Sequence, residues 1–148
     1  MGSRRQAREL ALKLLFQLEA AGFPEGDDAV ARFWDDNAAD ADVEYYASLV
    51  AKLVIENREE VDGLIRAAAA NWEFSRIAPA ERNLLRVAAA EILYVEDVPP
   101  RVAINEAIEL AKVYGTGPRA AAFVNGILDA LYNRRRSAPP APVKAAPE

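Results

Sequence analysis

The chain has 148 residues, enough for one domain that buries roughly 70% of its unfolded surface. It contains no cysteine and no histidine, which excludes disulfides, cysteine-ligated metal centres and Ser–His or Cys–His nucleophile pairs. The net charge of -5 is uneven: residues 25–62 hold twelve acidic and three basic side chains, whereas the remainder holds 15 basic and 11 acidic ones. A basic patch can therefore exist on this acidic chain.

Apolar side chains at helical spacing predict about seven helices and no convincing strand, which makes the chain all-α. The first helix is predicted over residues 4–20 and ends before Gly22 and Pro24. At 100° per residue its leucine-rich stripe faces the core, while Arg5, Arg8, Leu12 and Phe16 project from other sides. Phe16 lies nearly opposite the core stripe.

Six further helices are predicted, over about 27–37, 43–56, 58–72, 79–96, 101–114 and 119–133. Asp27 and Asp28 can cap the first of them, and Pro79 suits a first helical turn. No glycine or proline separates 43–56 from 58–72, so these are two helices or one bent rod. The helix over 79–96 is apolar almost all round, which predicts a central, buried position.

The last twelve residues, SAPPAPVKAAPE, cannot form a core and predict a disordered tail over 137–148. The folded domain is expected over 1–136. The longest apolar runs are too short to span a bilayer, and residues 1–20 show no signal-peptide cleavage pattern. We therefore expect a soluble cytoplasmic protein.

Arginines and an accessible aromatic ring on the first helix suggest a nucleic-acid surface. Arg4, Arg5 and Arg8 can neutralise phosphates, and the Phe16 ring can stack on an unpaired base. The alternative is a solvated helix start with Phe16 packed against a neighbouring helix. The residue pattern alone leaves both open.

Two polar positions in apolar surroundings need partners. Glu91 sits among apolar helical neighbours, so it either pairs internally with a cation such as an arginine or faces a partner's cation. Asn125 followed by Gly126 suggests the close approach of another backbone. Glu109 and Lys112 read most simply as a solvent-facing pair.

Nothing in the sequence indicates an enzyme or a bound cofactor. The acidic pairs lie in polar runs that give no reason for shifted pKa values. The loop Gly115-Thr116-Gly117-Pro118 precedes a helix but lacks the lysine and spacing of a phosphate-binding P-loop. A metal site made only of carboxylates stays open as a minor alternative.

Three segments together resemble the NusB family of bacterial transcription antitermination factors. They are Arg4–Ala11 with Leu15-Phe16, Arg76–Ile92, and Val98–Asp129 with its INEAIELAK and FVNGILD pieces. The resemblance implies two small helical bundles that share the first and central helices. It also implies a non-catalytic protein that binds the boxA element of ribosomal RNA transcripts jointly with NusE, a small-subunit ribosomal protein. Such a complex helps RNA polymerase read through terminators and supports ribosomal RNA processing, and some members are homodimers.

The resemblance also implies which residues contact RNA and which contact NusE. It assigns RNA contacts to Arg4, Arg5, Arg8, Phe16, Lys112, Arg119 and Phe123. It assigns the NusE surface to Glu81, Arg86, Glu91, Tyr94 and Glu106. It makes Asn105 and Asn125 inter-helix hydrogen-bonders. Between Gly115 and Phe123 this chain has seven residues, TGPRAAA, where the family typically has six, which reduces the loop's charged RNA contacts to Arg119.

Two other functions remain open from the sequence. NusB-like domains also occur fused to ribosomal RNA methyltransferases, so the chain could be a helical accessory module for an RNA-modifying enzyme. The altered loop instead suits a helical dimer with no RNA role.

Overall fold

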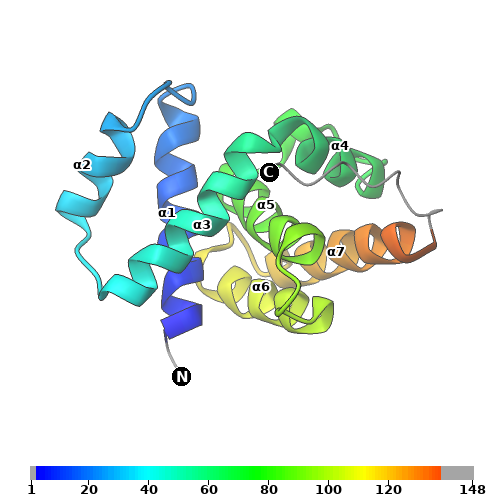
Figure 1. The fold of residues 1–148 in the computed structure, drawn as a ribbon. Helices are drawn as coiled ribbons and strands as arrows, with labels where there is room; N and C mark the ends of the chain where they lie inside the picture. The colour runs from blue at the N-terminus through cyan, green and yellow to red at the C-terminus, as the bar shows by residue number, and fades with distance from the viewer. Residues whose placement is uncertain (1–2, 138–148) are drawn as a thin grey trace, which may run out of the picture.

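The structure is a computed structural model that describes residues 3–137, and within that range it contains seven α-helices and no strand. The helices are α1 (Ser3–Ala20), α2 (Asp28–Asp36), α3 (Ala41–Glu56), α4 (Arg58–Ala68), α5 (Pro79–Tyr94), α6 (Pro100–Tyr114) and α7 (Ala120–Ser137), with a short 3-10 helix η1 (Phe74–Arg76) before α5. In Figure 1, α2 lies at the left of the molecule, α7 at the right and α5 between them. The all-α prediction is confirmed.

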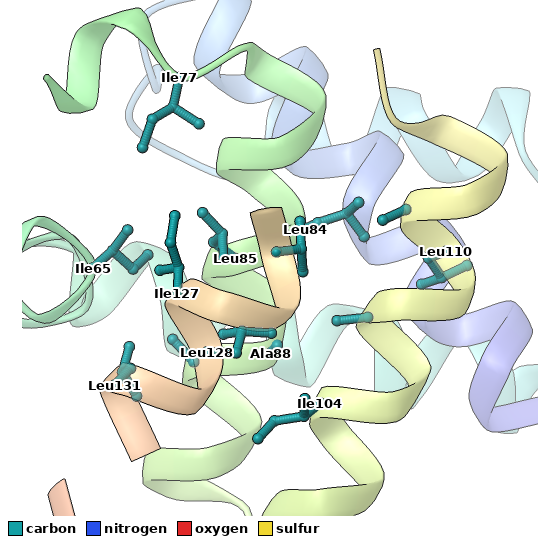
Figure 2. Close-up of a cluster of buried hydrophobic side chains, with 14 of the residues drawn as sticks. Ile65, Ile77, Leu84, Leu85, Ala88, Ile104, Leu110, Ile127, Leu128 and Leu131 are labelled. Atoms are coloured by element: carbon teal, nitrogen blue, oxygen red, sulfur yellow. The ribbon is translucent and has the colours of Figure 1, made fainter. Parts of the chain in front are cut away.

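Two hydrophobic cores share α5. Its Leu84, Leu85 and Ala88 pack with α4, α6 and α7, as Figure 2 shows. Val87 and Ala90, on another side of α5, pack with α1, α2 and α3. The predicted central position of this helix is confirmed, because ten of its residues between Glu81 and Glu91 are buried.

The first helix also serves both cores. Most of its buried leucines lie in the core with α3, but Leu12 is 3% exposed and belongs to the core with α6 and α7. The apolar stripe predicted for this helix therefore marks only one of its two buried sides. Arg8, on the second side, is buried as well.

The structure decides one helix boundary that the sequence left open and moves two others. α3 and α4 are two helices, because Asn57 leaves helical geometry (φ -116°, ψ 25°) and its side-chain amide donates to the Leu53 carbonyl at 2.8 Å. Asparagine competes for backbone groups in this way and favours a break. α4 ends at Ala68 and not near Trp72, since Ala69 is buried and Trp72 N–H closes a turn onto its carbonyl at 2.9 Å. α7 runs to Ser137, past the predicted end at Asn133.

The start of α2, the C-terminal residues and the surface complete the comparison with the sequence. Asp27 precedes α2, but its side chain makes no capping hydrogen bond. The predicted tail, 137–148, lies outside the described residues except for Ser137, the last residue of α7. Across residues 3–137, no helix has the length and apolar character needed to cross a membrane, and no three acidic side chains are grouped to hold a metal ion.

The close backbone approach predicted at Gly126 is wrong. A Cβ there would meet nothing within 4 Å. The glycine that cannot be replaced without movement is Gly115, at the end of α6. A Cβ at that position would lie 2.3 Å from the Ala120 Cβ and 2.4 Å from the Ala111 carbonyl oxygen. Gly115 therefore lets α7 begin directly against the end of α6.

Candidate RNA interface

Arg5 is exposed on α1 and pairs with α6. Its guanidinium donates from Nε and Nη2 to the two carboxylate oxygens of Glu106, at 3.0 and 2.7 Å. These hydrogen bonds raise the pKa of Arg5 and lower that of Glu106, although partial burial of Glu106 acts in the opposite direction. Such a forked pair fixes the orientation of both groups. Half of the Arg5 side chain stays open to solvent.

Arg8 lies one turn further along α1, under the surface. Its side chain is 5% exposed and its Nε donates to both oxygens of Glu91 at 2.9 Å. The Tyr46 hydroxyl of α3 also donates to Glu91, and Arg8 Nη1 lies 3.5 Å from Glu106. Burial of the Tyr46 hydroxyl is the larger cause that raises its pKa, and the hydrogen bond to Glu91 raises it further. Internal pairing of Glu91 with an arginine, one of the two options from the sequence, is confirmed.

The residues assigned to NusE binding are mostly interior. Glu81 accepts hydrogen bonds from the Thr116 backbone N–H at 2.8 Å and its hydroxyl at 2.6 Å, which ties the loop after α6 to α5. Arg86 is 3% exposed and binds Asp62 through two bonds at 2.8 and 2.9 Å. Glu91 is 1% exposed. Only Tyr94 and Glu106 of this set reach the surface in part.

Phe16 projects into solvent from α1. It is 45% exposed, so the alternative in which it is packed against a neighbouring helix does not hold. Lys13, one turn earlier, is also exposed and lies with its Nζ 5.7 Å from the centre of the Tyr114 ring of α6. The Tyr114 hydroxyl in turn donates to Glu9 of α1. Sequence reasoning missed Lys13, although it stands on the same helix as the arginines.

The other predicted contacts lie on α6 and α7. Lys112 is exposed and its Nζ lies 2.8 Å from Glu109, so the pairing expected from their spacing is present. Arg119 is exposed in the loop before α7. Phe123 is partly buried and makes an edge-to-face contact with Trp72, with ring centres 5.2 Å apart at 84°. Trp72 is 59% exposed and was not predicted as a site residue. The one feature of the sequence that could have indicated its exposure is the polar neighbour Asn71.

Two expected hydrogen-bonding roles are wrong. Asn105 is exposed, and its side chain makes no hydrogen bond to any described residue. Asn125 is half-buried and, within residues 3–137, its side chain makes none either. The links that hold α1, α5 and α6 together are instead charged: Arg5–Glu106 and Arg8–Glu91.

Similarity to known proteins agrees with this geometry. The transcription antitermination protein NusB of Syntrophus aciditrophicus (strain SB) is 40% identical over 132 residues, which cover 89% of this chain and 81% of that protein. The structure of T. maritima NusB matches with a TM-score of 0.79 at 35% identity, covering 88% of this chain and 90% of that one. A structure of the antitermination factors NusB and NusE in complex with dsRNA matches with a TM-score of 0.79 at 26% identity, covering 90% of this chain and 98% of that one. Residues 5–133 also match the model of the NusB family. The chain belongs to the NusB family of transcription antitermination proteins, a family of factors and not of enzymes.

Proposed function

We propose that this chain binds a boxA-type single-stranded element of ribosomal RNA transcripts together with NusE, within the RNA polymerase antitermination complex, and so supports ribosomal RNA processing. The solved NusB–NusE complex with dsRNA supports both partners. The observation that carries the proposal is the exposed Phe16 ring on the same side of α1 as the exposed Arg5. Eleven residues separate them, about 16 Å along a helix.

The two side chains supply different parts of single-strand binding. Arg5 binds a phosphate through the half of its side chain that stays open beside Glu106. The Phe16 ring stacks on a base, which contributes about 1–3 kcal/mol per base. Lys13 extends the positive charge along the same helix. Arg4 lies toward α3 instead, with its guanidinium 3.9 Å from the centre of the Tyr46 ring and 3.4 Å from the Asp97 carboxylate. Lys112, Arg119 and Phe123 continue the surface onto α6 and α7.

The buried members of the predicted site act by holding this surface in shape. Arg8 joins α1 to α5 through Glu91, and Glu81 holds the loop that carries Arg119 through its bonds to Thr116. Direct contact with NusE then falls to the exposed parts of Tyr94 and Glu106 and to side chains around them.

Binding of a boxA RNA oligonucleotide across a salt series tests the proposal. Arg5→Ala should weaken binding and reduce the slope of log K against log salt by about 0.7, because one phosphate contact is lost. Phe16→Ala should weaken binding by about 1–3 kcal/mol at every salt concentration and leave the slope unchanged.

Two exposed residues on other helices supply matched controls. Arg32→Ala on α2 and Tyr45→Ala on α3 should both bind RNA as the unaltered chain does. If Arg5→Ala and Phe16→Ala also bind as the unaltered chain does, the proposed surface is wrong.

A further inference from the structure

Trp72 is the most exposed tryptophan in the chain and has no role in the surface described above. It stands in the turn between α4 and η1, where its backbone N–H binds the Ala69 carbonyl at 2.9 Å. Its ring is steadied on one side by the Phe123 ring of α7 and is 59% exposed. An indole held in place but left open to water has a free surface on which a flat ligand can stack.

A hollow of about 420 Å³ opens beside this ring. Trp72 and Phe123 form its aromatic wall, and Pro118 with Arg119 in the loop before α7 lie among its other lining residues. Sites for small molecules in proteins commonly measure 300–1,000 Å³. The hollow is therefore large enough for one flat aromatic group and part of what is attached to it.

The charge at the rim favours an anionic ligand. Arg76 is 83% exposed and its one ion pair within the described residues, with Glu73 at 3.5 Å, is itself exposed and weak. Arg119, which also lines the hollow, is exposed. Glu81, the acid that lines the hollow, is 6% exposed and accepts two hydrogen bonds from Thr116, so two exposed arginines stand against one buried carboxylate. A base stacked on an aromatic ring with arginines near its phosphates is the usual arrangement for single-stranded nucleic acid.

The hollow is also continuous with the surface already described. Phe123 belongs to both, and the loop that carries Arg119 follows directly from Tyr114, which contacts Glu9 and Lys13 of α1. The hollow therefore lies beside the surface proposed for RNA.

We propose that the hollow between Trp72, Arg76 and Arg119 is a second base-binding site, which takes an unpaired base of the RNA stacked on Trp72. This site rests on the RNA binding proposed above. It shares Arg119 with the residues that the resemblance assigns and extends beyond them, because neither Trp72 nor Arg76 is among them.

Tryptophan fluorescence reports on this site directly. The chain has two tryptophans, so Trp34→Phe leaves Trp72 as the only one. Titration of that variant with single-stranded boxA RNA should quench its fluorescence at the same RNA concentration that saturates binding. Quenching by NusE alone and not by RNA would assign the hollow to a protein partner and overturn the proposal.

Affinity measurements separate this site from the first one. Trp72→Ala should weaken RNA binding about 5- to 150-fold without altering the salt slope, and Trp72→Phe should restore most of the loss. Tyr45→Ala, which removes a ring that is 71% exposed on α3, is the matched control and should change nothing. The Trp72→Phe protein guards against a folding defect, since it keeps an aromatic ring against Phe123.

The outcomes distinguish the two proposals. If the unaltered chain binds no RNA, both the proposed function and the second base-binding site are overturned. If RNA binds and Arg5→Ala weakens it, but Trp72→Ala binds normally and fluorescence is unchanged, the second site alone is overturned.

Discussion

The ion pair between Arg8 and Glu91 is buried, and its partners depend on each other. Both side chains are at most 5% exposed, and the Tyr46 hydroxyl completes the hydrogen bonding of the carboxylate. Removing one partner from a buried pair leaves an uncompensated charge, which commonly costs 3–5 kcal/mol. We therefore expect Glu91→Gln to lower the free energy of unfolding by about 3–5 kcal/mol, measured by urea denaturation.

Glu56→Gln supplies the comparison for that change. Glu56 pairs with Lys52 at 3.9 Å on α3, and both side chains are more than half exposed. Exposed pairs of this spacing contribute about 0.3–0.5 kcal/mol, so the free energy of unfolding should barely change. Equal losses for Glu91→Gln and Glu56→Gln would show that the buried pair is not a fixed part of the fold.

Glu19 makes stability depend on pH in the acid range. Burial raises its pKa, but hydrogen bonds from Arg82 and Arg86 outweigh that effect and lower the pKa from 4.5 to about 2. Because the folded pKa lies below the unfolded one, this contribution is complete above about pH 4.5 and is lost as pH falls toward 2. Unfolding free energies of the unaltered chain and Glu19→Gln should therefore converge as pH falls from 5 to 2. A constant difference over that range would contradict the assignment.

Residue roles were only partly predictable from sequence. The apolar surroundings of Glu91 showed that it needs a partner, and an arginine was among the options. The sequence did not identify Arg8 as that partner. Periodicity finds one apolar side of α1, whereas this helix packs against two cores. Arg8 was therefore placed with the exposed Arg4 and Arg5. The resemblance likewise supplied Phe123 but not Trp72, whose exposure depends on where α4 ends.

At the level of elements, the turn from α6 to α7 depends on one small residue. A Cβ at Gly115 would lie 2.3 Å from the Ala120 Cβ and 2.4 Å from a backbone oxygen, so α7 would have to move. Overpacking of this kind typically costs 1–3 kcal/mol. We expect Gly115→Ala to lower the free energy of unfolding by about that amount in urea denaturation.

Gly117, two residues later, is the matched control. A Cβ there would meet nothing within 4 Å, so Gly117→Ala should be neutral or slightly stabilising. The account of this turn is wrong if both alanine variants unfold at the same urea concentration.

Helix positions were predictable where local chemistry sets them. Pro79 begins α5, and the Pro99-Pro100 pair sets the start of α6. The end of α4 was placed four residues too late, because the alanine run after Arg66 favours helix, whereas the Trp72 N–H closes a turn onto the Ala69 carbonyl. The break at Asn57 was left open for a related reason, since a single asparagine can sit within a helix or end it.

At the scale of the whole molecule, the acidic residues and the proposed RNA surface lie on different helices. The acidic stretch 25–62 forms α2, α3 and the start of α4, while the proposed RNA surface lies on α1, α6 and α7, outside that stretch. Periodicity predicted the helices but not which of them pack together. The arrangement in two bundles came from the resemblance, and the two cores that meet at α5 confirm it.

Joint binding is the central claim at this scale, and it predicts that NusE and RNA strengthen each other's binding. Coupling between two ligands is reciprocal, so NusE should raise RNA affinity by the factor by which RNA raises NusE affinity. The most direct measurement is the Kd of boxA RNA for this chain with and without saturating NusE, at one salt concentration. The account predicts a lower Kd in the presence of NusE. An identical Kd with and without NusE would contradict it.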